Sequence, residues 1–204
     1  KWSPDGMNYA FTSSRSGVNN LYRISILGGE AEQLTDVKSG VSAFEWSPEG
    51  KSIAFLMADR MTEKEEKNKK AKEDWYYMDE NIKQNKLFVL NLSAKDSLHK
   101  YKSELLVKEP YNISDFDWSP DSKFIVFSHS KSPEVNDVVN SDISMVEILT
   151  GKIKPVATSQ AGENSPQFSH DGKYIAFHST TDPVDWAGPD FTKLYSMSES
   201  KITT

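Results

Sequence analysis

Short runs of alternating apolar and polar residues recur along this chain, and each leads into the same kind of turn. Val41–Trp46 alternates and is followed by Ser47-Pro48-Glu49-Gly50, after which Ser52–Phe55 is rich in β-branched and aromatic residues. Alternation with a period of two predicts a β-strand with one buried face. Ser-Pro-Asp/Glu-Gly fits a type I turn, because Pro presets φ at its second position. The pattern therefore predicts a β-hairpin.

This hairpin signature occurs four times, with its aromatic anchors 44, 72 and 50 residues apart. The copies begin at Trp2, Trp46, Trp118 and, in a degraded form, Phe168. A third strand is predicted after each hairpin, at 21–27, 87–92, 143–149 and 194–197, and a shorter fourth at 31–34, 104–107, 153–157 and near Ile202. Four antiparallel strands in about 45 residues form the unit of a β-propeller. A Greek-key sandwich, the alternative, does not explain a recurring signature.

We therefore expect an all-β fold, a partial β-propeller of about four blades with four antiparallel strands each, forming one fragment over 1–204. The blades are predicted at 1–36, 37–109, 110–158 and 159–204. Lys1 and Trp2 are interpreted as the tail of an inner strand, so the first blade lacks most of that strand. Because the first residue is Lys1 and no leader follows it, we expect a piece of a longer protein.

The long gap in the second blade comes from an insert at 59–85. Thr62 followed by Glu65 is a capping box, which predicts a charged helix. Ion pairs at i,i+4 are expected to support it at Glu63–Lys67, Glu65–Lys69 and Glu66–Lys70. Two interpretations stay open: a solvated or disordered excursion, or an arm that docks on a neighbouring domain or subunit through Trp75, Tyr76 and Tyr77, which need a cover.

Composition removes several classes of function. The chain has no Cys, which excludes disulfides, Cys-ligated zinc and thiol catalysis. The formal net charge is -6, without a basic stripe, so nucleic acid is not expected as a partner. There is no run of 18 apolar residues, so no membrane span is predicted. The four histidines are not at metal-ligand spacing; no metal and no cofactor are expected. A homo-oligomer is compatible with the sequence, and a soluble periplasmic or cytoplasmic location is left undecided.

The repeat resembles a known family. Trp-Ser-Pro-Asp-Gly, then Lys-x-Ile-Ala-Phe, Leu-Tyr-x-Ile and Leu-Thr, is similar to the WD40-type repeats of TolB-like propellers, which also form the N-terminal propeller of the prolyl oligopeptidase family of serine peptidases. The stretch 77–80 running into 85–92, and the acidic stretch 182–190 before Thr192-Lys193-Leu194-Tyr195, look like the acylaminoacyl-peptidase and dipeptidyl-peptidase branch. The resemblance covers essentially the whole chain.

The resemblance implies a propeller that caps an α/β-hydrolase domain and gates and recognises peptide substrates. The nucleophile of such a domain sits in a Gly-x-Ser-x-Gly elbow. Gly40-Val41-Ser42 and Gly50-Lys51-Ser52 begin that pattern, but Phe44 and Ala54 stand at the second glycine. No catalytic residue is therefore predicted in this chain, and the enzymatic activity is expected in a domain outside it. The alternative function is a TolB-like protein-binding propeller without activity.

The most distinctive loop is Asp182-Pro183-Val184-Asp185-Trp186-Ala187-Gly188-Pro189-Asp190, between the second and third strands of the fourth blade. Asp182, Asp185 and Asp190, together with Trp186, are the candidate substrate-binding residues, because carboxylates attract a cationic group such as a peptide N-terminus. The loop does not match the calcium motif Asp-x-Asp-x-Asp-Gly. A polar loop with a packed Trp is the competing interpretation.

Overall fold

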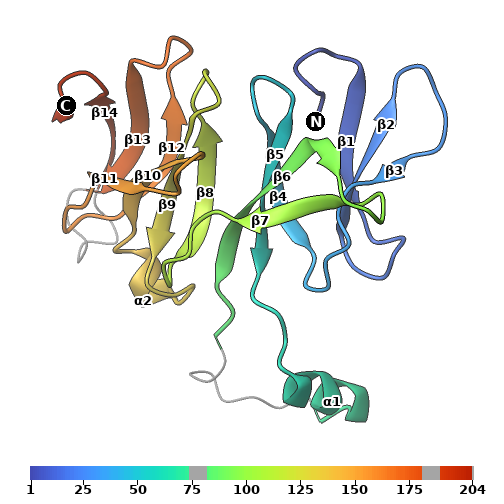
Figure 1. The fold of residues 1–204 in the computed structure, drawn as a ribbon. Coiled ribbons are helices and arrows are strands. Elements are labelled where there is room, and N and C mark those ends of the chain that lie inside the picture. The colour runs from blue at the N-terminus through green and yellow to red at the C-terminus, as the bar shows by residue number, and fades with distance from the viewer. Residues whose placement is uncertain (74–81, 181–188, 204) are drawn as a thin grey trace.

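The computed structural model describes residues 1–73, 82–180 and 189–203 and folds them into four antiparallel β-sheets standing side by side (Figure 1). Strands that follow one another in the sequence are neighbours in each sheet. The sheets contain, in order, β1 (Asn8–Ser13), β2 (Asn20–Ser25) and β3 (Glu32–Gln33); β4 (Val41–Trp46), β5 (Ser52–Ala58), β6 (Asn85–Lys95) and β7 (Tyr101–Leu105); β8 (Asn112–Trp118), β9 (Phe124–Ser130), β10 (Asp142–Glu147) and β11 (Ile153–Ala157); and β12 (Glu163–Phe168), β13 (Tyr174–Thr180), β14 (Asp190–Ser196) and β15 (Lys201–Thr203). The predicted all-β fold of propeller-like blades is confirmed.

The first sheet has three strands, and Lys1 and Trp2 stand where its inner strand ends. Trp2 forms an antiparallel bridge with Tyr9. The Ala10 amide donates to the Lys1 carbonyl at 2.9 Å. The N-terminal ammonium group of Lys1 donates to the Ala10 carbonyl at 2.7 Å. These contacts agree with the interpretation of the two residues as the tail of a strand that pairs with β1.

The repeated signature forms the predicted tight turn, and the third blade shows why each residue is there. The Ser122 amide donates to the Ser119 carbonyl at 2.8 Å, closing a four-residue turn. The Ser119 hydroxyl donates to Asp121 at 2.7 Å and accepts from the Phe124 amide at 2.9 Å. Ser122 has φ of 60°, where Gly6 in the first blade has 69°. Glycine is the common residue at this position because it adopts a left-handed conformation without strain.

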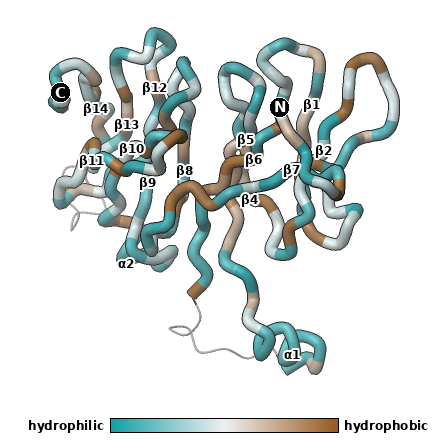
Figure 2. Tube along the Cα trace, in the orientation of Figure 1, coloured by the Kyte–Doolittle hydropathy of each residue, from teal (hydrophilic) through white to brown (hydrophobic). Residues whose placement is uncertain are grey.

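The hydrophobic core consists of three layers, one between each pair of adjacent sheets. The second strand of each of the last three blades contributes a fully buried phenylalanine, namely Phe55, Phe127 and Phe177. Since alternate residues of a strand point to opposite faces, both faces of the two middle sheets are buried. In Figure 2 the hydrophobic positions accordingly gather along the sheets, whereas the helix that projects from them is hydrophilic over most of its length.

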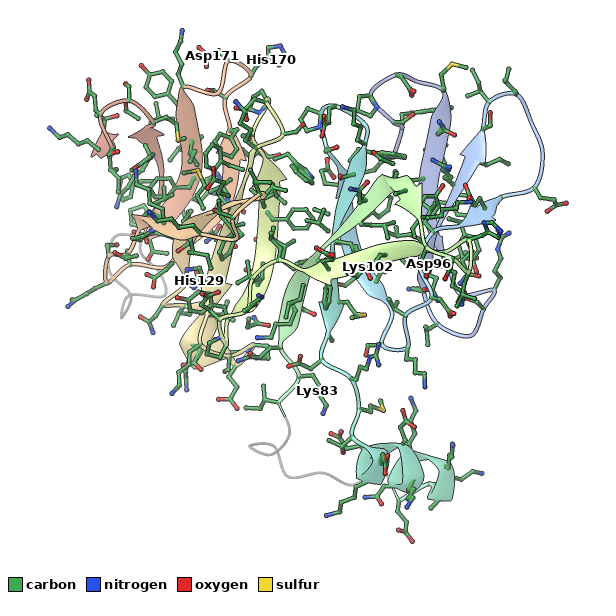
Figure 3. The ribbon with its side chains drawn as sticks, in the orientation of Figure 1. Lys83, Asp96, Lys102, His129, His170 and Asp171 are labelled. Atoms are coloured by element: carbon green, nitrogen blue, oxygen red, sulfur yellow. The ribbon has the colours of Figure 1, made fainter. Side chains whose placement is uncertain are left out.

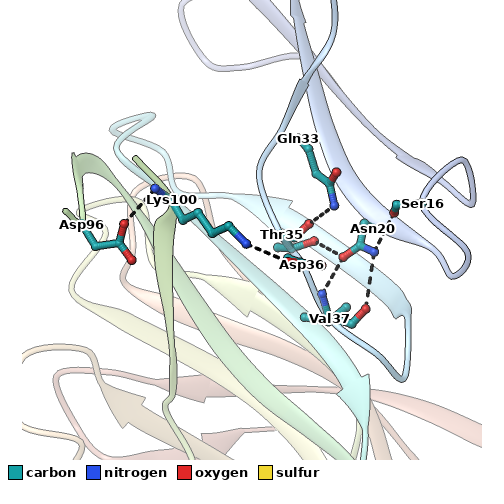
Figure 4. Close-up of polar contacts among 8 residues, drawn as sticks. All are labelled: Ser16, Asn20, Gln33, Thr35, Asp36, Val37, Asp96 and Lys100. Atoms are coloured by element: carbon teal, nitrogen blue, oxygen red, sulfur yellow. Dashed lines mark hydrogen bonds and ion pairs between the residues drawn. The ribbon is translucent and has the colours of Figure 1, made fainter. Parts of the chain in front are cut away.

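A network of polar side chains joins the first sheet to the second, as Figure 4 shows. The side-chain Oδ1 of Asn20 accepts from the Thr35 hydroxyl at 2.9 Å and from the Val37 backbone amide at 2.8 Å. Lys100, in the hairpin that joins β6 to β7, donates to Asp36 at 2.9 Å. Because Asn20 and Thr35 are buried, their mutual hydrogen bond satisfies groups that water does not reach.

Two helices interrupt the described strands. Helix α1 (Glu63–Ala71) is the predicted charged helix, and it begins at the predicted capping box: Thr62 accepts from the Glu65 amide, and Glu65 accepts from the Thr62 amide. Helix α2 (Val135–Val138) follows β9 and was not expected from the pattern. Within the described part of the chain, neither helix has the length and apolar character needed to span a membrane.

Candidate functional site

Both helices lie at the same end of the row of sheets, which we call the insert end (Figure 1). Because the strands of each sheet are antiparallel, the connections from second to third strand all leave at one end, and the chain also passes from blade to blade there. The signature turns lie at the opposite end: Figure 3 shows His170 and Asp171 far from Lys83. Insertions and inter-blade loops therefore share one surface.

The segment that carries α1 is fixed to the third blade at its base. The Asp59 amide donates to the Gln84 carbonyl at 2.9 Å, which closes the two ends of the insert. The Gln84 side chain donates to the Lys131 carbonyl at 2.8 Å and to the Pro110 carbonyl at 3.2 Å. Backbone acceptors of two different connections thus hold one side chain, and the orientation of the insert root is set by the neighbouring blade.

Lys86 strengthens this root. Its ammonium donates to the Gln84 side chain at 2.6 Å, to the Tyr111 carbonyl at 2.9 Å and to the Glu109 carbonyl at 3.3 Å. Burial lowers the pKa of Lys86, and the nearby charge of Asp59 partly opposes that shift. The three oxygen acceptors use all three N–H donors of an ammonium group. Lys86 therefore stabilises the structure and is not available to bind an anion.

Helix α1 is held by Glu65 and not by pairs along its own surface. Lys83 and Glu65 form an ion pair at 2.8 Å, and hydrogen bonds from Lys83 and Thr62 lower the pKa of Glu65 to about 2. The expected pairs Glu63–Lys67, Glu65–Lys69 and Glu66–Lys70 are not among the ion pairs within 4.0 Å in the described residues, so that prediction is wrong for this structure. For Glu65 the reason is that Lys83, from the returning chain, forms the ion pair in place of Lys69.

A buried histidine lies next to the insert end. His129 shares a hydrogen bond of 2.9 Å between its Nε2 and the Ser144 hydroxyl and stacks on the Tyr111 ring, with centroids 4.0 Å apart. Burial lowers the pKa of His129 to about 4. His129 stands next to the end of β9 and is nevertheless buried, because the third blade lies between two other blades.

The serine–histidine pair is not a nucleophilic site. Asp142 lies opposite His129 in the β9–β10 register, but no hydrogen bond joins their side chains, and no carboxylate contributes to the pKa of His129. Ser144 is only 4% exposed, so a substrate cannot reach its hydroxyl. A catalytic triad needs an accessible nucleophile and a third group that orients the base. This pair has neither, so it is a structural pair.

Glu163 is another buried polar residue at the insert end that sequence reasoning did not single out. It is fully buried and accepts from the Ser159 hydroxyl at 2.5 Å. Burial, with a contribution from the Glu163 charge, raises the pKa of Asp142. An alignment of the repeats could have indicated this burial. Glu163 stands five residues before its aromatic anchor, where the second and third blades have the apolar residues Val41 and Ile113.

The candidate substrate-binding residues are only partly described. Asp190 is exposed and opens strand β14, where it pairs with Thr180. The sequence pattern placed Asp190 in a loop, and that assignment is wrong, because the ladder between β13 and β14 extends to this pair. Asp182, Asp185 and Trp186, and the aromatic residues Trp75, Tyr76 and Tyr77, lie outside the described residues. Among the residues that are described, no group of three or more His, Asp or Glu side chains is placed to hold a metal ion.

The insert end depends on one very close backbone contact. A Cβ atom on Gly162 would lie 2.4 Å from the Val139 carbonyl oxygen, just after α2. We expect Gly162→Ala to lower the free energy of unfolding by about 2 kcal/mol, because a backbone atom cannot move aside as a flexible side chain can. Urea denaturation measures this effect. Gly151→Ala is the control: its added Cβ meets nothing within 4 Å, so it reports only the cost of a positive φ. Equal losses in the two variants would contradict the steric argument.

No family model matches the chain. It is 30% identical over 186 residues to a protein named uncharacterized peptidase YuxL from Bacillus subtilis, covering 91% of this chain and 22% of that protein. It is 28% identical over 168 residues to dipeptidyl-peptidase 5 from Porphyromonas gingivalis, covering 78% of this chain and 20% of that protein. The chain thus spans about a fifth of the length of these relatives.

Solved structures share the fold at lower identity. A TolB structure from Agrobacterium tumefaciens matches with a TM-score of 0.63 and 20% identity, covering 100% of this chain and 62% of that one. Acylaminoacyl peptidase from Pyrococcus horikoshii matches with a TM-score of 0.63 and 13% identity, covering 100% and 30%. A prolyl endopeptidase structure matches with a TM-score of 0.61 and 14% identity, covering 99% and 28%.

Proposed function

Since this chain is a partial β-propeller related to the propellers of TolB and of the prolyl oligopeptidase and acylaminoacyl-peptidase group, we propose that it is the non-catalytic propeller of a serine peptidase. The observation that carries the proposal is the match of 91% of this chain to a fifth of a protein named as a peptidase. Peptide-bond hydrolysis then takes place in an α/β-hydrolase domain outside this chain. The propeller controls the access of peptide substrates to that domain and recognises them.

The topology supports a role for the insert end in this arrangement. A blade of four antiparallel strands begins its inner strand and ends its outer strand at the same end. A hydrolase domain joined to the propeller by short connections then sits over the insert end. The root formed by Gln84 and Lys86, helix α2 and the start of β14 surround the space between the two domains, and a peptide passes these groups on its way to the nucleophile.

Asp182, Asp185, Trp186 and Asp190 are proposed to meet the substrate there. Asp190 is exposed, so its carboxylate is accessible from solvent. A carboxylate facing a partly desolvated cavity attracts the α-ammonium of a peptide more strongly than one at an open surface, where a charge pair contributes about 0–1 kcal/mol. Trp186 adds apolar area for the first side chain of the peptide.

The test is the double substitution Asp185→Asn with Asp190→Asn in the full-length protein. We expect KM to rise about tenfold for peptides with a free N-terminus, because each variant side chain keeps its shape but loses its charge. Peptides with a blocked N-terminus carry no α-ammonium and should show nearly unchanged KM. Steady-state kinetics on matched free and acetylated chromogenic peptides measure both.

Two controls separate the parts of this proposal. The 204-residue chain alone should hydrolyse neither substrate, and turnover that survives repurification and is blocked by a serine-directed inhibitor would contradict its non-catalytic role. A full-length protein without peptidase activity would instead favour a TolB-like binding propeller. Equal rises in KM for free and blocked peptides would leave the peptidase assignment in place and remove the recognition role of the two aspartates.

A further inference from the structure

Strand β7 is the outer edge strand of the second sheet, and its length and sequence suit it for pairing with a strand of another chain better than the other described outer strands. The other three outer strands of the described structure are poorer templates: β3 has two residues, β15 has three, and β11 contains Pro155, which has no N–H to donate. β7 has five residues, Tyr101-Lys102-Ser103-Glu104-Leu105, and no proline. A free edge of this kind is a template for strand addition.

The hydrogen-bond ladder shows which groups of β7 are free. The Leu106 amide donates to the Leu87 carbonyl at 2.9 Å, and the register continues with Leu105 opposite Phe88 and Ser103 opposite Leu90. Hydrogen-bonded and non-hydrogen-bonded pairs alternate in an antiparallel ladder. The N–H and C=O groups of Ser103 and Leu105 therefore point away from β6, toward the open edge.

The sequence of β7 is complementary to itself in antiparallel orientation. With Ser103 of one copy opposite Ser103 of the other, Lys102 faces Glu104 at two symmetric positions, and Tyr101 faces Leu105. Opposite charges directly across a strand pair are favourable, and like charges are unfavourable. The outward groups of Ser103 form the hydrogen-bonded pair at the centre. From these two observations we propose that two copies of this chain associate through β7, which joins their second blades into one eight-stranded sheet with two-fold symmetry.

The charges on this edge are accessible for that pairing. Lys102 and Glu104 form an ion pair of 2.9 Å within one strand, and their side chains are 77% and 70% exposed. Figure 3 marks the position of Lys102 on β7. In the dimer each Lys102 lies beside Glu104 of its own strand and opposite Glu104 of the other copy, so the four side chains alternate in charge. Exposed pairs contribute little to affinity individually, so they mainly select the register and the partner.

The strand is held ready for a partner by contacts with the first blade. Arg23 donates to the Tyr101 hydroxyl at 2.7 Å and to Glu32 at 2.8 Å, and Lys95 pairs with Glu32 at 2.7 Å. These contacts fix both the tip of the β6–β7 hairpin and the start of β7. A preorganised edge loses little conformational entropy when a second strand binds to it.

Apolar surface beside the edge adds to the expected interface. A groove of about 520 Å³ runs between β7 and the turn that joins β10 to β11, and Val89, Leu105, Ile148 and Leu149 line it together with polar residues. Leu149 is 91% exposed and Leu105 is 39% exposed. A second sheet at this edge lengthens the wall of the groove and covers part of this apolar surface.

The test is sedimentation velocity of the full chain over a concentration series, with charge variants of β7. We expect a monomer–dimer equilibrium in the unmodified chain. Lys102→Glu alone places two carboxylates opposite each other, and Glu104→Lys alone places two ammonium groups opposite each other, so each should weaken dimerisation at least tenfold. The combination Lys102→Glu with Glu104→Lys restores opposite charges and should return the dissociation constant to within about threefold of the original.

Two further variants make the result decisive. Ser103→Pro removes an outward N–H without removing a bond to β6, so it should abolish the dimer while circular dichroism and the melting temperature report an intact fold. Lys173→Glu alters another exposed lysine paired with an acidic residue two positions away, at 3.1 Å, and should have no effect. A chain that stays monomeric at all concentrations, a dimer that tolerates Ser103→Pro, or a double charge variant as weak as the single ones would overturn the proposal. None of these outcomes bears on the peptidase assignment.

Discussion

Replacing Phe127 with alanine is expected to lower the free energy of unfolding by about 3 to 5 kcal/mol, the usual cost of truncating a fully buried phenylalanine. Phe127 has no exposed surface and packs in the layer between the second and third sheets. A cavity there affects two blades at once, because the layer contains residues such as Ile113 and Leu87 from both. The sheets on either side cannot move closer without breaking their other contacts, so we expect little relaxation.

Urea denaturation followed by tryptophan fluorescence measures this loss. Phe191→Ala is the matched control, because Phe191 lies on β14 and is 44% exposed. That variant should cost less than about 1 kcal/mol, since nearly half of the residue is already exposed to water and less apolar area is lost from the interior. Similar losses in the two variants would mean that the layer between the second and third sheets is not a packed core.

The second large effect is a dependence of stability on pH that comes from His129. Its pKa is about 4 in the folded chain, against an ordinary value of 6.5, because the imidazole is buried between Tyr111, Phe127 and Ser144. Between these two pH values the unfolded chain binds a proton that the folded chain does not. Stability therefore rises with pH across this window, and about 3 kcal/mol is lost as the pH falls from 6.5 to 4.

The variant His129→Gln should lose most of this dependence, because glutamine does not titrate and keeps a polar group near Ser144. The measurement is the free energy of unfolding at pH 7, 5.5 and 4.5 for the variant and for the unmodified chain. His170→Gln, in a signature turn at the other end of the sheets, is the control and should follow the unmodified chain. The explanation fails if His129→Gln and the unmodified chain lose the same stability between pH 7 and 4.5.

The repeat pattern predicted most of the fold because its information is local. A signature of five residues contains the whole turn: Ser119 and Asp121 bond to amides within five residues of themselves. The strands β6, β10 and β11 lie close to their predicted ranges. Thr62 capped α1 as expected, for the same reason. The predicted ion pair between Glu65 and Lys69 was wrong because a residue more distant in the sequence, Lys83, pairs with Glu65.

The candidate site was less predictable than the fold. The aspartates and Trp186 were selected for their chemistry and for the position of their loop in the repeat, and only Asp190 among them lies in the described chain, in a strand and not in a loop. Gln84, Lys86 and Glu163 were not singled out from the sequence. The identity of a polar residue does not reveal its hydrogen-bond partners in the folded chain. Their partners come from other blades or inter-blade connections: Gln84 reaches a carbonyl 47 residues away.

What the sequence determined by itself, then, is the repeating unit: hairpins with a serine-based turn, strands of alternating polarity, and one capped helix in an insert. Each of these depends on residues that are neighbours in the chain. The tertiary structure alone decided which polar groups lie together at the insert end, that His129 is buried, and that β7 is an outer edge strand of the described structure, fixed by the contact between Arg23 and Tyr101, which are 78 residues apart. Burial and hydrogen-bond partners between blades depend on how the sheets stack, and no local pattern contains that information.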